Sequence, residues 1–227
     1  SSVGTAIVKV FDLAVATTGW NAKKLRALGK EFTEIHTHPN SHATYYPGAT
    51  QFSLKLIFDP KSGEIFGAQG VGRDGVDKRI DVISTSIRAG ITAPELADLE
   101  LAYAPPFGSA KDPVNMLGYI ADNIVSKSTE IAQWSEINKF RADGYALVDV
   151  RSQSEYANGT IPGSINIPVD ELRERHLEIN NKKVIVNCQV GQRGHVATML
   201  LRSLGYDAKN LDGGYLTWIN SPAGNIK

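Results

Sequence analysis

The residues best suited to chemistry lie around Cys188, the only cysteine among 227 residues. The apolar run 184–187 predicts a strand that ends at this cysteine, and the periodic segment 196–204 predicts a helix soon after it. A tight loop between strand and helix turns backbone N–H groups inward, and the helix N-terminus adds partial positive charge. Such a setting lowers the pKa of a thiol, so we predict an activated Cys188 thiolate. The loop predicted to form this anion cradle consists of Gln189, Val190, Gly191, Gln192, Arg193 and Gly194.

The spacing inside the loop indicates which anion it holds. Four residues separate Cys188 from Arg193, whereas a cysteine phosphatase loop has five residues between its Cys and Arg, and here Gly194 occupies that place. A smaller cradle fits one extra sulfur atom better than a phosphate. The loop resembles the active loop of the rhodanese family of sulfurtransferases. A small buried cysteine at a strand end is the alternative interpretation.

Composition limits the classes of function. Lys plus Arg and Asp plus Glu both number 24, so the formal net charge is zero, which argues against nucleic acid or an anionic membrane as the main partner. No apolar stretch reaches membrane-spanning length. A single cysteine excludes internal disulfides and fits a reducing compartment, so we expect a cytoplasmic protein. The chain starts without an initiator Met, and we expect it to be a fragment.

The first half of the chain reads as strands followed by helices. This order predicts an α+β domain over residues 1–125, with an antiparallel sheet and helices. The predicted strands are 4–15, 32–37, 51–58 and 64–71, and the predicted helices are 75–89, a short one from Pro94, and 113–125.

Two patterns in this half invite a stronger interpretation. Residues 70–75 match G-x-G-x-x-G, but their strand is the second arm of a hairpin and no βαβ unit follows, so tight turns are the preferred explanation. His36, His38 and His42 could share a face, yet no Cys, Asp or Glu joins them at the spacing of a metal site. We therefore expect neither a dinucleotide site nor a metal site.

Several motifs of the first half resemble the dimerisation domain of flavin-dependent pyridine nucleotide-disulfide oxidoreductases, and in particular the coenzyme A-disulfide reductase, NADH oxidase and NADH-dependent persulfide reductase group. The motifs are 42–49, 67–72, 75–81, 101–107 and 112–115. The resemblance implies a homodimer through residues 1–125, in which Tyr45 and Tyr103 reach into the active site of the partner subunit. It also implies that FAD- and NADH-binding domains with a redox cysteine precede Ser1. FAD, NAD(P)H and coenzyme A would then serve the full-length parent, and this fragment would bind none of them.

The second half alternates strands and helices after a polar linker predicted at 126–133. This alternation predicts an α/β domain with a parallel sheet over 134–227, and ligands of such sheets bind at the C-terminal strand ends, where Cys188 lies. The segments 147–151, 159–168 and 211–218 follow the rhodanese pattern in order and spacing. We read Asp149 and Arg151 as structural support that holds the neighbouring loop by an ion pair. His195 follows the cradle and is expected to be exposed or to cap the helix.

These expectations converge on sulfur chemistry. By resemblance to rhodaneses, Cys188 would carry sulfane sulfur as a persulfide, and because no second cysteine is present, the sulfur would have to leave to an external thiol. The resemblance implies coenzyme A or the reductase cysteine of the parent as that thiol. Two alternatives remain: a non-catalytic dimerisation and docking module, and a cysteine phosphatase, which the loop length disfavours.

Overall fold

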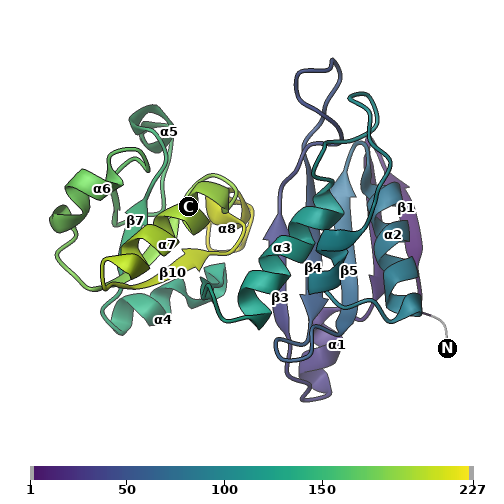
Figure 1. Cartoon of the computed structure of the whole chain (residues 1–227), viewed down its shortest axis with the longest axis horizontal. Helices are drawn as coiled ribbons and strands as arrows, with labels where there is room; N and C mark the ends of the chain where they lie inside the picture. Colours follow the sequence, from purple (N-terminus) through teal and green to yellow (C-terminus); the bar gives the residue numbers. More distant parts are fainter. Residues whose placement is uncertain (1–2, 225–227) are drawn as a thin grey trace. The chain divides into compact units, whose positions relative to one another are not determined.

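The computed structural model describes residues 3–224. The chain divides into two compact units, and the boundary along the chain falls between Ser126 and Lys127. Each unit has its own sheet (Figure 1). Among the described residues, the helices are too short or too polar to span a bilayer.

The first unit is built on an antiparallel sheet whose five strands, within residues 3–126, follow the order β1-β2-β5-β4-β3. The strands are β1 (Ala6–Val10), β2 (Leu13–Gly19), β3 (Thr33–Thr37), β4 (Phe52–Phe58) and β5 (Ile65–Gly72). The helices are α1 (Ala22–Ala27), α2 (Val76–Ala89), the 3-10 helix η1 (Pro94–Asp98) and α3 (Pro113–Val125). The predicted α+β class with an antiparallel sheet is confirmed.

Alternation along the strands determines which face of this sheet is buried. In β4, Phe52, Leu54 and Leu56 are buried on one face while Ser53 and Lys55 on the other face are not. Helices α2 and α3 lie over the buried face in Figure 1. The other face is covered only in part, where Ile57 packs with residues of α1. A capping box at Asp112 starts α3, because its side chain accepts from the Val114 N–H at 3.0 Å.

The first predicted strand, 4–15, is in fact a hairpin. Val10 pairs with Leu13, so Phe11 and Asp12 form a two-residue turn between β1 and β2. Phe11 has a φ of 53° and is 93% exposed. An unbroken strand was expected because neither turn residue is Gly or Asn, the usual signal for a positive φ in such a turn.

The second unit is built on a parallel sheet with the order β6-β10-β9-β7-β8 among the described residues. Its strands are β6 (Ile131–Ala132), β7 (Ala146–Asp149), β8 (Ser164–Asn166), β9 (Lys183–Asn187) and β10 (Asp207–Leu211). Its helices are η2 (Trp134–Glu136), α4 (Ile137–Ala142), α5 (Gln153–Ala157), α6 (Leu172–Arg175), η3 (His176–Glu178), α7 (Gln192–Ser203) and α8 (Gly214–Ile219). The predicted α/β class with a parallel sheet is confirmed.

Helices cover both faces of this sheet. Val184 and Val186 of β9 pack in one apolar cluster with residues of α6 and α7, whereas Ile185 packs in another with residues of α4 and α8. The central strand is therefore buried on both sides, which explains its unbroken apolar sequence. It ends at Asn187, so Cys188 follows at the carboxyl edge of the sheet.

The segment 126–133 was expected to be a linker, but most of it belongs to the second unit. Strand β6 pairs in parallel with β10, and the Asn210 N–H donates to the Glu130 carbonyl at 3.0 Å. Two residues of backbone pairing leave no periodicity that a sequence pattern can reveal, which is why the polar run concealed an edge strand.

Candidate active site

Cys188 lies between the end of β9 and the start of α7, and only 1% of its surface is exposed. The Gly191 N–H donates to its Sγ, with N and S 3.2 Å apart. Gly191 has a φ of 101°, a conformation that a side chain disfavours, and this turn brings the amide back over the sulfur. The twelve-residue helix α7 starts at the next residue, so its N-terminus faces the same site.

The predicted cradle residues follow Cys188 in the chain and differ in how far they are buried. Cys188 and Gly194 are buried, Gln189 and Val190 are half-buried, and Gln192 is exposed at the start of α7. A Cβ at Gly194 would come within 2.4 Å of the Asn210 Oδ1, so glycine is needed for close packing of α7 against β10.

Hydrogen bonds from residues 210–216 hold the backbone of the loop that follows Cys188. The Tyr215 N–H donates to the Cys188 carbonyl at 2.7 Å, and the Leu216 N–H donates to the Gln189 carbonyl at 3.0 Å. The Asn210 Nδ2 donates to the Gly191 carbonyl at 3.1 Å. These contacts were not predicted, although the Gly-Gly pair 213–214 was a signal of a close backbone approach. They fix the backbone of the loop whose Gly191 N–H contacts the sulfur.

Asp149 and Arg151 form a buried ion pair beside the loop. The Arg151 Nη2 donates to the Asp149 Oδ2 at 2.6 Å, and its Nε donates to both carboxylate oxygens at 3.0 and 3.1 Å. The Arg151 Nη1 reaches the Gln189 Oε1 at 3.3 Å, and its Nη2 reaches the Gly159 carbonyl at 2.7 Å. The pair thus connects the end of β7 with the first residue after the cysteine.

Arg193 has a partner that the sequence analysis missed. Its Nη1 and Nη2 donate to the two carboxylate oxygens of Glu155 at 2.8 and 2.6 Å. These hydrogen bonds lower the pKa of Glu155 to about 2 and raise the pKa of Arg193, to which the Cys188 sulfur also contributes. The available signal was the Ser152-x-x-Glu155 capping box, which the structure shows at the start of α5.

His195 is half-buried rather than exposed. Its Nδ1 lies 3.3 Å from the Thr129 Oγ1, and burial lowers its pKa. The Cys188 site is thus a buried thiol, a hydrogen-bonding loop amide, a helix N-terminus and an arginine paired with a carboxylate. The arrangement places a hydrogen-bond donor and a helix N-terminus at the sulfur.

Tyr45 and Tyr103, 58 residues apart in sequence, lie together in the first unit. Their hydroxyl oxygens are 2.8 Å apart, and this hydrogen bond raises the pKa of Tyr103. Both line a cavity of about 290 Å³ together with His42, Lys111 and others. The structure therefore brings together the two phenols that the resemblance selects.

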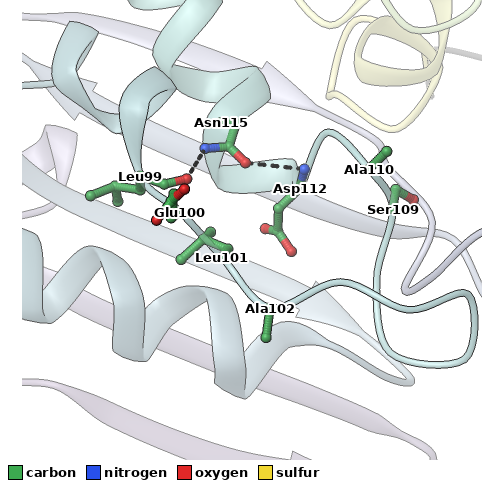
Figure 2. A pocket seen from close by; sticks show the side chains of 8 residues that line it. All are labelled: Leu99, Glu100, Leu101, Ala102, Ser109, Ala110, Asp112 and Asn115. Carbon is green, nitrogen blue, oxygen red and sulfur yellow. Dashed lines mark hydrogen bonds between the residues drawn. The ribbon is translucent and has the colours of Figure 1, made fainter.

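A second cavity of the first unit, about 470 Å³, is lined by eight residues (Figure 2). The Asn115 side chain there accepts from the Asp112 N–H at 3.2 Å and donates to the Leu99 carbonyl at 2.9 Å. Asp112 is paired with Arg79, whose Nη2 lies 3.0 Å from its Oδ2. The Asn115 and Asp112 side chains therefore have hydrogen-bond or ion-pair partners within the chain, and Asn115 holds the loop at Leu99 in place.

The G-x-G-x-x-G segment does not fit a nucleotide. A Cβ would lie 2.8 Å from Val76 Cγ1 at Gly70, 2.2 Å from Phe52 Cβ at Gly72 and 2.5 Å from Arg79 Nη1 at Gly75. The glycines therefore permit packing inside an antiparallel sheet and do not cradle a pyrophosphate. Among residues 3–224, no three His, Cys, Asp or Glu side chains gather as they would around a metal ion.

Comparison with family models agrees with this division of the chain. Residues 5–113 match the dimerisation domain of the pyridine nucleotide-disulphide oxidoreductases, and residues 133–221 match the rhodanese-like domain.

Individual relatives match the same regions. A coenzyme A disulfide reductase from Staphylococcus haemolyticus is 41% identical over 122 residues, 54% of this chain and 27% of that protein. The crystal structure of reduced CoADR-RHD from Bacillus anthracis is 52% identical with a TM-score of 0.93, and a NAD-dependent persulfide reductase from A. fulgidus is 38% identical with a TM-score of 0.86. Each covers 96% of this chain, which spans 39% of either.

The chain therefore spans about a quarter to two fifths of these relatives' length. The Cys188 loop lies in the region matched by the rhodanese model, and the Tyr45–Tyr103 pair lies in the region matched by the dimerisation model. The chain thus joins a region that matches the dimerisation domain of the pyridine nucleotide-disulphide oxidoreductases to a region that matches the rhodanese-like domain, and its homologues include coenzyme A disulfide reductases and a NAD-dependent persulfide reductase.

Proposed function

We propose that the second unit carries sulfane sulfur as a persulfide on Cys188 and transfers it to an acceptor thiol. The observation that supports this most is the contact of the Gly191 N–H with the Cys188 Sγ at 3.2 Å, at the N-terminus of α7. A hydrogen-bond donor and a helix dipole favour the thiolate and, after loading, the anion of the terminal sulfur.

The reaction has two balanced steps. The Cys188 thiolate attacks the outer sulfur of a donor R–S–SH, the S–S bond of the donor breaks, R–S⁻ leaves, and the outer sulfur remains on the enzyme as Cys188–S–SH. An acceptor thiolate then attacks that outer sulfur, which becomes a persulfide on the acceptor, and Cys188 leaves again as a thiolate. The cradle amides and α7 stabilise the anion in both states.

The acceptor must come from outside this chain, because Cys188 is its only cysteine. An internal disulfide therefore cannot release the sulfur. By likeness to its homologues, the acceptor is coenzyme A or a redox cysteine of flavin and pyridine nucleotide domains in the full-length parent. In such a parent, FAD and NAD(P)H would supply the electrons that release sulfide or reduce a disulfide.

The first unit would form the homodimer through residues 1–125. In this proposal the Tyr45 and Tyr103 phenols face the active site of the partner subunit, where a hydroxyl pair can donate hydrogen bonds to a sulfur anion. Their 2.8 Å hydroxyl contact supports a joint role, since it holds the two rings in one orientation.

The Cys188→Ser variant tests the persulfide directly. Incubation of the wild-type protein with polysulfide should add about 32 Da, one sulfur atom, under non-reducing conditions, and the serine variant should gain nothing. Turnover should be lost in the variant as well. An unmodified wild-type mass, or normal turnover by the serine variant, would contradict the proposal.

These measurements, together with an assay of aryl phosphate hydrolysis, distinguish sulfur transfer from the phosphatase and docking alternatives. A cysteine phosphatase would hydrolyse an aryl phosphate with Cys188, and a docking module would neither load sulfur nor turn over. The buried thiol, its amide contact and the paired Arg193 favour sulfur transfer over both, because binding alone requires none of them.

A further inference from the structure

The positive charges around the Cys188 cradle are neutralised by carboxylates, which is unusual for a site that would accept a highly charged anion. Two arginines contact or adjoin the loop, and each is already paired with a carboxylate. Arg151 is paired with Asp149 at 2.6 Å, and Arg193 with Glu155 at 2.6 Å. Neither guanidinium offers an unopposed positive charge to an incoming donor.

The two pairs differ in accessibility. The Arg151–Asp149 pair is fully buried, and Arg151 also bonds within the structure to Gly159 and Gln189. The Arg193 and Glu155 side chains are 38% and 33% exposed, so this pair lies where a donor can approach. Arg193 stands in the loop that follows Cys188, five residues after the cysteine, so the pair lies at the end of the cradle.

Glu155 is held in this position by its own helix. The Ser152 N–H donates to its Oε2 at 2.9 Å, and its own N–H donates to the Ser152 Oγ at 3.2 Å. The carboxylate therefore stays beside Arg193 when a donor arrives, and its charge is already present at neutral pH. An anionic donor therefore meets the Arg193 guanidinium together with the Glu155 carboxylate.

We infer that Glu155 makes the Cys188 site select a sulfane-sulfur donor of low negative charge, an alkyl persulfide, over the dianion thiosulfate. The inference rests on the proposed function, in which Cys188 accepts sulfane sulfur. From thiosulfate, Cys188 would take the outer sulfur and sulfite would leave; from an alkyl persulfide, it takes the outer sulfur and a thiolate leaves. Glu155 is a specificity-determining residue because it cancels the charge that the dianion would need.

The Glu155→Gln variant frees Arg193 without removing the cap of α5, since Gln also serves in a capping box. The rate of persulfide formation on Cys188 would be followed by mass with two donors, thiosulfate and the persulfide of cysteamine, whose ammonium group offsets its anion. The ratio of the second-order loading rate constant for thiosulfate to that for cysteamine persulfide should rise about fivefold in this variant, the effect of one partly exposed charge. Added salt should lower the thiosulfate rate more steeply than in the wild type.

Two further variants distinguish selection from structural support. Glu155→Asp keeps the charge and should keep the wild-type ratio, whereas Glu155→Gln combined with Arg193→Gln should lose the gain for thiosulfate. If Glu155→Gln slows both donors equally and leaves the ratio unchanged, the carboxylate only holds the loop and the inference is overturned. If the wild-type protein gains no sulfur from either donor, the proposed function itself fails.

Discussion

Gly214 packs closely against the backbone of the loop that follows Cys188. Its φ is 63°, and a Cβ there would lie 2.4 Å from the Cys188 carbonyl oxygen and 2.9 Å from the Gly191 nitrogen. Both atoms belong to the backbone of the loop, so a side chain at this position can only be admitted if the loop moves.

We expect Gly214→Ala to lower sulfur transfer about 100-fold, because displacement of a reacting group by about 1 Å has that effect. Steady-state rates and the mass of loaded protein would measure it. Gly205→Ala is the matched control: Gly205 also has a positive φ, 80°, but nothing lies within 4 Å of its added Cβ. The control should lose about 1 kcal/mol of stability and keep its activity. Equal activity of both variants would contradict the loop-support argument.

The Glu155–Arg193 pair should make stability depend on acid. Its contact lowers the pKa of Glu155 from 4.5 to about 2, so the stabilisation is present above pH 4.5 and is lost as the pH falls toward 2. Both side chains are about one third exposed, and solvent screening limits the effect to about 1 kcal/mol. The free energy of unfolding of wild type should therefore exceed that of Glu155→Gln at pH 7, and the gap should close near pH 2. A gap that stays constant from pH 7 to pH 2 would exclude this linkage.

The spacing within one loop was enough to select its residues, and Asp149 and Arg151 were predicted by resemblance, but the other long-range partners of the loop were missed. Cys188 and Arg193 stand in one loop, so their spacing was sufficient to select them. Glu155 and Asn210 reach the loop from other strands and helices, and a single sequence carries no record of such contacts. The capping function of Glu155 was readable, but its bond to an arginine 38 residues away was not.

At the scale of elements, the β1–β2 hairpin shows where apolar sequence patterns fail to predict the end of a strand. Its turn uses Phe11 at a positive φ in place of Gly or Asn, so the apolar segment looked continuous. Strand β6 was missed for a different reason, because two residues are too few to show alternation. Long amphipathic elements such as α2 and α3 were predictable because their apolar period is sustained over several turns.

We expect Phe11→Gly to raise the stability of the first unit by about 0.5–1 kcal/mol. Glycine adopts a positive φ without strain, and the Phe11 side chain is 93% exposed, so its removal costs little burial. Chemical denaturation would measure the change. The control is Lys9→Gly, in the adjoining strand, where glycine should lower stability instead. A loss of stability in Phe11→Gly would show that the turn does not strain Phe11.

At the scale of the whole chain, each unit has its own apolar core. Ile80 of α2 is buried in the first unit, and Leu201 of α7 is buried in the second. The contrast between strands followed by helices and strands alternating with helices was enough to predict both units. The boundary between the two units was harder to predict, because the polar residues near 127 have the composition of an ordinary loop.

We expect the two units to unfold as separate transitions. Leu201→Ala and Ile80→Ala should each lower the stability of their own unit by about 2–5 kcal/mol through loss of burial and creation of a cavity. Hydrogen exchange followed peptide by peptide would locate each effect. Exchange that accelerates across the whole chain in either variant would instead indicate one cooperative unit.

The 1% exposure of Cys188 has a consequence for damage by oxidants. Over-oxidation of a thiolate to sulfinic or sulfonic acid requires a peroxide to reach the sulfur, and susceptibility follows exposure as well as thiolate character. The closed loop therefore shields the chain's single thiol, and a shield of this kind also slows alkylating reagents. The rate at which a small alkylating reagent labels Cys188 therefore reports how often the loop exposes the sulfur, and no other cysteine of this chain contributes to the signal.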